Sequence, residues 1–343
     1  MKKYLYRLLA CTAVCIALPV PSALADANAG LDDIIAGHIV PRYQVLEAAT
    51  GDLSSAIVTD CKDGMLADAA AITAFKTALV AWQSIQHIRF GPVMVDDRHY
   101  RFEYWPDKHG QGARQVRKLL SAAASDIPTP ASIGKASVAI QGFPALERVI
   151  HDTGVDNKAR CALAVSISAN LNAMSAATLK EWSSWRPASG SDGVELIARN
   201  LSDQLGLMAD LKLARPLGAS LAQARPRRAE HWRSSLSYAA LAANFDGLHG
   251  LFEGENSRPG LRAAMLAAGG TVRQADQMAE HLKYGSTFIG WQRLPLHEAV
   301  SDAQARDQVM FLLKHVHYTQ ELVKSAVYPA LGLAMGFNSQ DGD

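Results

Sequence analysis

The sequence predicts an all-α protein built from two antiparallel helical bundles, with no significant sheet. Apolar residues such as Ile72, Phe75, Leu79 and Trp82 recur at steps of three and four, which is the spacing of one helix face. Alternating runs of β-branched residues long enough to form strands are absent from the sequence. The 343 residues less the first 25 leave about 318, more than one hydrophobic core comfortably serves, so we expect two bundles.

Helical periodicity marks most of the chain, and breaks in that periodicity mark the connections. Pro41 should kink or restart the first helix, because proline lacks the backbone N–H that a helix interior needs. We place the N-terminal bundle in 26–190 and the C-terminal bundle in 191–343, with the boundary broadly within 183–230. Helices are expected over 31–60, 68–88, 133–141, 144–151, 155–182, 193–213, 231–252, 272–289 and 303–327, and non-helical connections over 91–110, 126–132, 183–192, 214–230 and 253–260.

The first 25 residues have the pattern of a cleavable signal peptide. A basic start, MKKYLYR, precedes the apolar run LLACTAVCIALPV and a small-residue cleavage site, Ala23-Leu24-Ala25. That run is too short to span a bilayer, and we expect no later segment long enough to do so. Cys11 follows a lipobox-like Leu-Leu-Ala, but the stretch before it is too short for an apolar core. We therefore favour cleavage and export to the periplasm over lipid anchoring at Cys11.

Charge and cysteine content narrow the classes of partner and compartment. Without Lys2, Lys3 and Arg7 the chain carries 31 basic and 33 acidic residues, net −2 with His neutral. That balance provides no electrostatic footprint for nucleic acid or for an anionic membrane. Two cysteines remain, Cys61 and Cys161. In an oxidising compartment they most simply form one disulfide, and a pair of buried thiols is the alternative.

The stretch GFPALERVI, residues 142–150, interrupts a helical pattern and places an acid shortly after the interruption. Pro144 is tolerated in the first turn of a helix, where its missing N–H would be unpaired anyway. Gly142 and Phe143 then separate two helical pieces, and Glu147 lies one turn into the second. Glu147 either complements the helix dipole or pairs with an arginine such as Arg148, or it serves as a pocket ligand.

The connection RFGPVMVDDRHYRFEYWPDKHG, residues 89–110, is the second candidate region. A connection of about twenty residues inside a compact domain is usually functional or mobile. Its arginines, acids and aromatics suit an ordered loop that lines a cleft, although an ion-paired lid over the end of a bundle would have the same composition. The candidate cleft residues are Arg89, Arg98, Arg101, Glu103, Trp105 and Asp107, with His109 as a candidate metal ligand beside Glu147.

Other patterns that carry chemistry are weak or absent. His317 and Glu321 can share a helix face, but one His–Glu pair supplies too few ligands for a metal ion. The sequence contains no H-E-x-x-H, Cys-x-x-Cys, EF-hand, G-x-S-x-G or phosphate-loop motif. We therefore assign no catalytic residue.

The order of several motifs resembles the imelysin-like family. These are HIVPRYQVLEAA, AWQSIQHIRFGP, FEYWPDKHG, GFPALERVI and the C-terminal LGLAMGFNSQDGD, and the most specific pieces are 89–109, 142–148 and 331–343. The resemblance covers essentially the whole exported chain and is strongest to periplasmic or lipoprotein members encountered with iron-uptake components. It implies two helical bundles with a Gly-x-His-x-x-Glu signature at their junction. Imelysin itself is an insulin-cleaving metallopeptidase.

One position departs from that signature. Gly142 and Glu147 match it, but Pro144 stands where the family has histidine. Proline offers no lone pair to a metal, so a zinc site built on that histidine cannot form here. The leading hypothesis is therefore a non-enzymatic periplasmic binding or accessory protein in iron uptake, with Fe or another divalent or trivalent cation held at Glu147 and iron-uptake components of the cell envelope as partners.

Two alternatives remain open. The first is a zinc metallopeptidase whose ligands come from other side chains, such as His109, His315 or His317, since zinc needs at least three protein ligands. The second is a docking module in which Arg89, Arg98 and Arg101 bind an anionic partner.

Overall fold

The computed structural model describes residues 30–66, 69–152, 154–187 and 193–334, and these residues form helices and turns without any strand. The all-α prediction is confirmed. The predicted signal peptide, the predicted boundary at 190/191 and most of the C-terminal motif lie outside the described residues.

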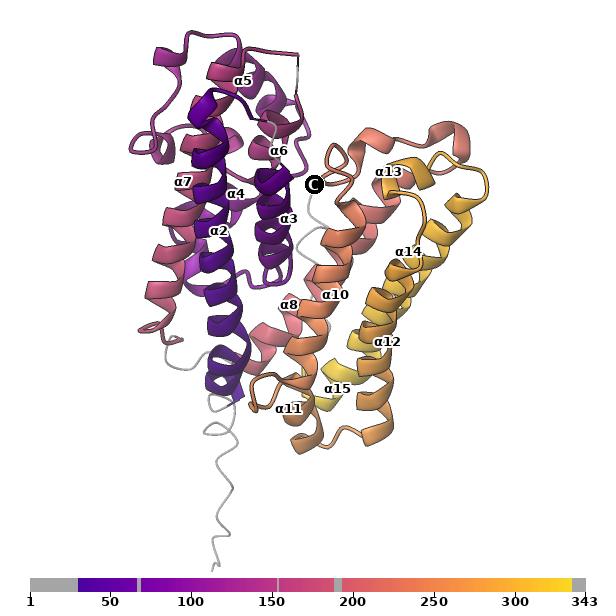
Figure 1. Cartoon of the computed structure of the whole chain (residues 1–343). Coiled ribbons are helices and arrows are strands. Elements are labelled where there is room, and N and C mark those ends of the chain that lie inside the picture. The colour runs from indigo at the N-terminus through magenta and orange to yellow at the C-terminus, as the bar shows by residue number, and fades with distance from the viewer. Residues whose placement is uncertain (1–29, 67–68, 153, 188–192, 335–343) are drawn as a thin grey trace, which may run out of the picture.

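The first group of helices forms an upright bundle in which α2, α3 and α7 run side by side (Figure 1). The short helices α4, α5 and α6 lie beside these three long helices. The elements are η1 (Ile35–Ile39), α2 (Val40–Asp60), η2 (Cys61–Asp63), α3 (Ala69–Gln83), η3 (Gly91–Asp97), α4 (Arg98–Phe102), α5 (Gln111–Leu120), η4 (Ala124–Asp126), η5 (Ile133–Lys135), η6 (Val138–Ile140), α6 (Phe143–His151) and α7 (Asn157–Trp182).

The second group packs α10, α12 and α14 side by side, and α10 contacts α3 of the first group. The two bundles therefore meet along α3 and α10. The elements are α8 (Gly193–Leu207), η7 (Met208–Ala214), α9 (Arg215–Leu217), η8 (Leu221–Gln223), η9 (Pro226–Arg228), α10 (Ser237–Glu253), α11 (Leu261–Ala267), α12 (Val272–Gly290), α13 (Leu296–Ala299), α14 (Ala305–Leu322), η10 (Val323–Val327) and α15 (Tyr328–Ala330).

Helix boundaries differ from the prediction where backbone geometry overrides periodicity. Pro41 was expected to kink or restart the first helix, but the backbone stays helical through it: the π-helix η1 ends at Ile39, and α2 follows directly with the proline in its first turn. The helix predicted over 231–252 begins only at Ser237. His231 and Ser235 have φ angles of 49° and 58°, which an α-helix excludes.

Two further predictions of local structure were wrong. Residues 133–141 form two short 3₁₀ turns rather than one helix, because Ser137 is extended and its hydroxyl accepts the Ala139 N–H to start a new turn. The segment 91–110 is not an uninterrupted loop, since it contains the 3₁₀ segment η3 and the short helix α4. The irregular part of that segment is therefore 103–110.

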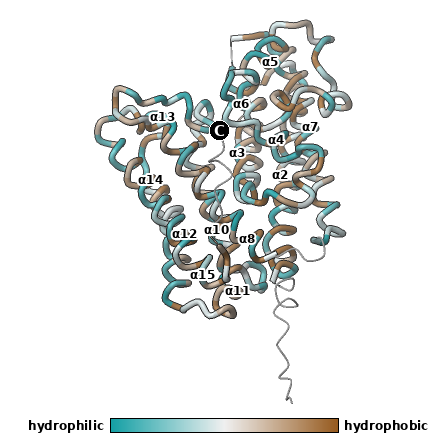
Figure 2. The backbone as a smooth tube through the Cα atoms, turned by 180° about the vertical axis from the view of Figure 1, so that it is seen from behind, coloured by the Kyte–Doolittle hydropathy of each residue, from teal (hydrophilic) through white to brown (hydrophobic). Residues whose placement is uncertain are grey.

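The core of the first bundle is aromatic. Trp82 stacks on Phe102 at 4.6 Å between ring centroids, and Phe75 meets Phe143 edge-on. Figure 2 shows apolar and polar residues mixed along the helices of both bundles, as expected for helices that bury part of their surface. This packing fixes α4 and α6, which carry residues of the site described below.

Helix α7 is the longest helix of the first bundle. It packs against α2 and α6, and Cys61 and Cys161 form a disulfide with Cα atoms 5.5 Å apart, the first of the two alternatives left open by the sequence. Contrary to our expectation, α7 is long and apolar enough to cross a membrane by length and composition. Alanine-rich core helices meet the same criteria, and 56% of its most apolar window is buried.

Candidate functional site

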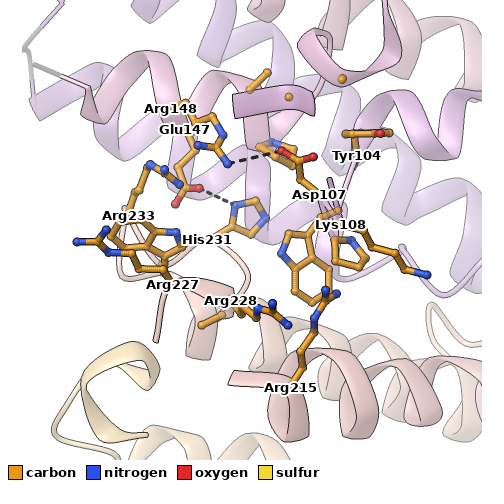
Figure 3. Close-up of a pocket in the computed structure, with 18 residues that line it drawn as sticks. Tyr104, Asp107, Lys108, Glu147, Arg148, Arg215, Arg227, Arg228, His231 and Arg233 are labelled. Carbon is orange, nitrogen blue, oxygen red and sulfur yellow. Dashed lines mark ion pairs between the residues drawn. The ribbon is translucent and has the colours of Figure 1, made fainter. Parts of the chain in front are cut away.

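A cavity of about 170 Å³ lies at the junction of the two bundles (Figure 3). One wall is formed by residues 104–108 and by the first turns of α6, including Pro144 and Glu147. The opposite wall comes from Arg215 and from residues 227–233, which precede α10. The cavity therefore depends on both bundles.

Cationic side chains dominate its walls. Six of them, Lys108, Arg148, Arg215, Arg227, Arg228 and Arg233, face only two carboxylates, Asp107 and Glu147. Arg148 pairs loosely with Asp107 at 4.0 Å. Within the described part of the chain, the other four arginines have no carboxylate within ion-pair distance. Guanidinium groups gathered without counter-charges form a binding site for anions.

Burial, with a smaller contribution from repulsion between the arginines, lowers the pKa values of two of them. Burial, followed by the neighbouring Arg148, lowers the pKa of Arg233 to about 10. Burial lowers the pKa of Arg215 as well, and Arg228 and Arg225 add to the effect. An anion in the cavity would relieve this repulsion, since each guanidinium would gain an opposite charge.

Trp232 holds two of the arginines in place. The Arg233 guanidinium carbon lies 4.4 Å from the centroid of the Trp232 ring, and that of Arg227 lies 5.7 Å from it. Stacking on an indole restricts a guanidinium while leaving its edge N–H groups available. The two cations are therefore positioned before any ligand binds.

Glu147 fastens the arginine-bearing segment to the first bundle. The Ser234 backbone N–H and hydroxyl both donate to Glu147 Oε1, at 2.9 and 2.6 Å. Glu147 Oε2 faces His231 Nδ1 at 3.6 Å, an ion-pair distance longer than a hydrogen bond. Burial opposes the charged carboxylate, but His231 and Ser234 outweigh it and lower the pKa of Glu147 to about 2.

His231 joins Glu147 to a second buried carboxylate. Its Nε2 lies 3.3 Å from both oxygens of Glu103, which comes from the end of α4. Burial disfavours the imidazolium, yet Glu103 and Glu147 together raise the pKa of His231 well above its ordinary value. Burial raises the pKa of Glu103 despite this neighbour. The imidazole missing at position 144 is thus matched by one from the other bundle, which contacts Glu147 as a charge partner.

A buried lysine completes the polar interior behind the cavity. Lys212 Nζ lies among four oxygens, at 2.8 Å from Glu230, 2.7 Å from Gln83, 2.9 Å from Gln86 and 2.7 Å from Asn244. Among the described residues, Glu103, Glu230 and His231 form the group of three whose ligand atoms lie within 4.8 Å of one another. The ammonium already supplies a cation beside this group.

The predicted site residues fall into three places. Pro144, Glu147, Trp105 and Asp107 line the cavity. Glu103 belongs to the buried network behind it. Gly142 lies beneath, where a Cβ atom would approach the Phe102 carbonyl oxygen to 2.3 Å, so only glycine allows α6 to start against α4.

The remaining predicted residues have other neighbours. Arg98 forms a two-pronged ion pair with Glu181 at 2.8 and 2.7 Å, and Arg101 donates to Gln141 at 2.7 Å. The Arg89 backbone N–H donates to Asn200. His109 is exposed and lies outside the cavity walls. None of these three arginines lines the cavity.

The described residues do not bring zinc ligands together in either of the arrangements considered from the sequence. Pro144 carries no ligand atom, and the oxygens of Glu147 are engaged by Ser234 and His231. His109, His315 and His317 belong to no three-residue ligand group in the part of the chain that the structure describes.

Sequence reasoning missed the second wall of the cavity. The stretch RPLGASLAQARPRRAEHW falls in the predicted connection 214–230 and at the start of the predicted helix 231–252, and it was assigned no binding role from the sequence. Arginines alternating with a histidine and a tryptophan were the available signal. The residues that sequence reasoning missed are Lys212, Arg215, Arg227, Arg228, Glu230, His231, Trp232, Arg233 and Ser234.

Comparisons with known proteins agree with the fold. The sequence model of the imelysin family, peptidase family M75, matches residues 39–323. An imelysin-like protein from Psychrobacter arcticus 273-4 superposes with a TM-score of 0.78 at 19% identity, covering 91% of this chain and 98% of that one. A putative iron-regulated protein A precursor from Parabacteroides distasonis ATCC 8503 gives 0.66 at 13% identity, covering 88% and 95%. No curated protein matches the sequence significantly.

Proposed function

Since the chain belongs to the imelysin family, we propose that it is a non-enzymatic binding protein of the cell envelope whose junction cavity holds a small anion with two or more negative charges. The cluster of unpaired arginines carries this proposal. Planar guanidinium groups bind carboxylate and phosphate oxygens in pairs, and several together favour a multiply charged ligand over a single carboxylate.

The non-enzymatic part rests on the state of Glu147. A general base or metal ligand needs a carboxylate oxygen that faces the substrate or ion. In this chain Ser234 and His231 engage both oxygens, and Pro144 replaces the histidine of the family signature. Incubation with a denatured protein substrate and added zinc should leave the substrate intact. Cleavage that stops with a chelator and returns with zinc would contradict this part.

We propose that the anion bound in the cavity is a complex that contains iron. One structural neighbour is named as a putative iron-regulated protein A precursor, and ferric ion in water is commonly carried by polycarboxylates as anionic complexes. A cationic cavity suits such a complex better than it suits a bare cation, which the arginines would repel. The partners would be iron-uptake components of the envelope, and the signal-peptide pattern of residues 1–25 supports export to the periplasm.

Calorimetric titration with acetate, malonate and tricarballylate tests the anion site, because the three differ mainly in their number of carboxylates. Affinity should rise at least about tenfold with each added charge at low salt. Arg228→Gln and Arg233→Gln should each weaken tricarballylate binding at least about tenfold. Arg225→Gln is the matched control, since Arg225 belongs to the same basic segment but does not line the cavity. No heat with tricarballylate, or equal binding by Arg233→Gln, would refute the site.

The iron link has its own test. Ferric citrate and the redox-inert gallium citrate should both bind more tightly than free citrate if the cargo is a metal chelate. Equal affinity for free citrate and its complexes would leave an anion-binding protein without an iron role.

A metal ion at Glu103, Glu230 and His231 is the second candidate, favoured by their three ligand atoms lying within 4.8 Å of one another. Such an ion would have to displace the Lys212 ammonium, which lies 2.8 Å from Glu230. Titration with ferric, ferrous, zinc and calcium ions separates the candidates. Binding that disappears in Glu103→Gln but persists in Arg233→Gln would favour the metal over the anion.

A further inference from the structure

A second contact between the bundles is built around two buried histidines. His38 lies in η1, and His87 lies in the turn that follows α3; their exposed fractions are 1% and 0%. Their Nε2 atoms are 2.9 Å apart. At that distance the two nitrogens form a hydrogen bond, in which one nitrogen carries the proton and donates and the other accepts.

The proton positions along this contact follow from Glu255. His38 Nδ1 lies 2.7 Å from Glu255 Oε2, and an ionised carboxylate can only accept, so Nδ1 carries a proton. Neutral His38 therefore has a bare Nε2, to which His87 Nε2–H donates. His87 Nδ1 is then bare as well, and it is buried without a hydrogen-bond partner among the described residues.

One added proton cannot be accommodated in this arrangement. If His87 takes it, the new N–H forms at Nδ1, where no acceptor is present. If His38 takes it, His87 must accept at Nε2 and carry its own proton at Nδ1, which has the same result. A buried donor without a partner is costly, and a buried positive charge without a partner is more so.

Glu255 and Asp246 favour a proton on His38, but burial outweighs them. Arg42 from α2 already binds Glu255 through two contacts, at 2.6 and 3.0 Å, and also contacts Asp246 from α10 at 3.3 Å. Arg89, from the segment after α3, adds positive charge near His87. Burial lowers the pKa of His38 and lowers that of His87 further, where His38 and Arg42 add to the effect.

Gly37 and Gly250 allow the residues of the α10–α11 connection to pack closely at this contact. A Cβ atom on Gly37 would approach the Glu255 carbonyl oxygen to 2.8 Å, and one on Gly250 would reach the Glu255 carboxylate at 2.3 Å. The Asn256 amide donates to the Gly37 carbonyl oxygen at 2.7 Å. We therefore expect a misplaced proton to be relieved by movement of η1 away from His87 and from the α10–α11 connection.

We infer that the chain His87–His38–Glu255 is an acid-released latch, which holds η1 and the start of α2 against the α10–α11 connection only while both histidines are neutral. None of the three latch residues lines the anion cavity, so the latch does not depend on the proposed ligand. Because burial depresses both folded-state pKa values below that of the unfolded chain, the latch stabilises fully above about pH 6.5 and is lost as the pH falls.

Hydrogen–deuterium exchange of the protein without the predicted signal peptide, measured at about pH 7.5 and 5.5, tests the latch. After correction for intrinsic rates, segments 31–42 and 246–258 should exchange at least about tenfold faster at the lower pH, while α12 stays unchanged. His87→Gln should remove this response, because its amide can donate to His38 but does not titrate. His249→Gln changes a histidine of α10 that is not part of the latch, so this variant should keep the faster exchange at the lower pH. Equal protection of the wild type at both values, or an unchanged response in His87→Gln, would overturn the latch.

A measurement on the unaltered protein covers the case in which His87→Gln does not fold. Imidazole ¹⁵N spectra of the wild type should show His87 neutral down to the pH at which segments 31–42 and 246–258 lose protection, with one common midpoint. A His87 that becomes charged while the contact remains protected would contradict the inference.

Discussion

Ser234 donates its backbone N–H and its hydroxyl to one oxygen of Glu147, at 2.9 and 2.6 Å, across the junction of the two bundles. Glu147 follows the Gly-Phe-Pro break in the first bundle, and Ser234 directly follows the arginine segment of the second. A carboxylate in a metal-ligand motif is therefore used here to hold a cationic wall in place. The other oxygen faces His231, the residue that turns the segment towards α10.

Glu147→Gln should destabilise the protein and weaken anion binding together. The amide can still accept from Ser234, but the buried His231 loses one of its two charge partners and keeps only Glu103. Breaking one member of a buried ion pair costs about 3–5 kcal/mol. Urea unfolding gives this change, and the exposed Glu280→Gln should stay within about 0.5 kcal/mol of the wild type. A Glu147→Gln protein as stable as the wild type would show that the contact does not fasten the segment.

The stability of the protein should fall at alkaline pH through His231. Because the folded-state pKa of His231 lies above its ordinary value, its stabilisation is complete below about pH 6.5 and is lost as the pH rises through the folded-state pKa. Unfolding free energies measured in steps from pH 7 to about 10 should decline for the wild type. They should decline less for His231→Asn, while exposed His109→Asn should follow the wild type. A parallel decline in all three proteins would assign the effect to other groups.

Gly142→Ala should disrupt the start of α6. The added methyl group would meet the carbonyl oxygens of Phe102 and Arg101 at 2.3 and 2.4 Å, and backbone atoms cannot give way as a flexible side chain can. We expect a loss of about 3 kcal/mol. Gly290→Ala is the matched control, because nothing lies within 4 Å of its Cβ position, and it should change stability by less than about 1 kcal/mol. Equal effects of the two substitutions in thermal unfolding would contradict the close approach at Gly142.

Helix type and order could be predicted because apolar periodicity is a local property of the chain. The step from Ile72 to Trp82 identifies α3 without any knowledge of its neighbours. The residue at which a helix begins was harder to predict where the backbone angle of a single residue determines it. The φ angle of 49° at His231 places residues 231–236 in a turn, although their composition is compatible with a helix.

Only one of the two walls of the cavity could be predicted from the sequence. Gly142, Pro144 and Glu147 stand close in sequence, so their spacing identified one wall. The other wall begins about 70 residues later, and nothing in a local pattern indicates that His231 would meet Glu147. A basic run is usually solvated, so neither the predicted connection 214–230 nor the start of the predicted helix 231–252 indicated a binding wall. Their role became visible only when the fold left four arginines without carboxylate partners among the described residues.

A crystal of the protein soaked with selenate tests the central claim most directly, because this tetrahedral dianion is located by its anomalous scattering. The account predicts a strong peak inside the junction cavity, beside the guanidinium groups of Arg228 and Arg233, that disappears in Arg233→Gln and remains in Arg225→Gln. Selenate bound only on the outer surface, with nothing in the cavity, would contradict it.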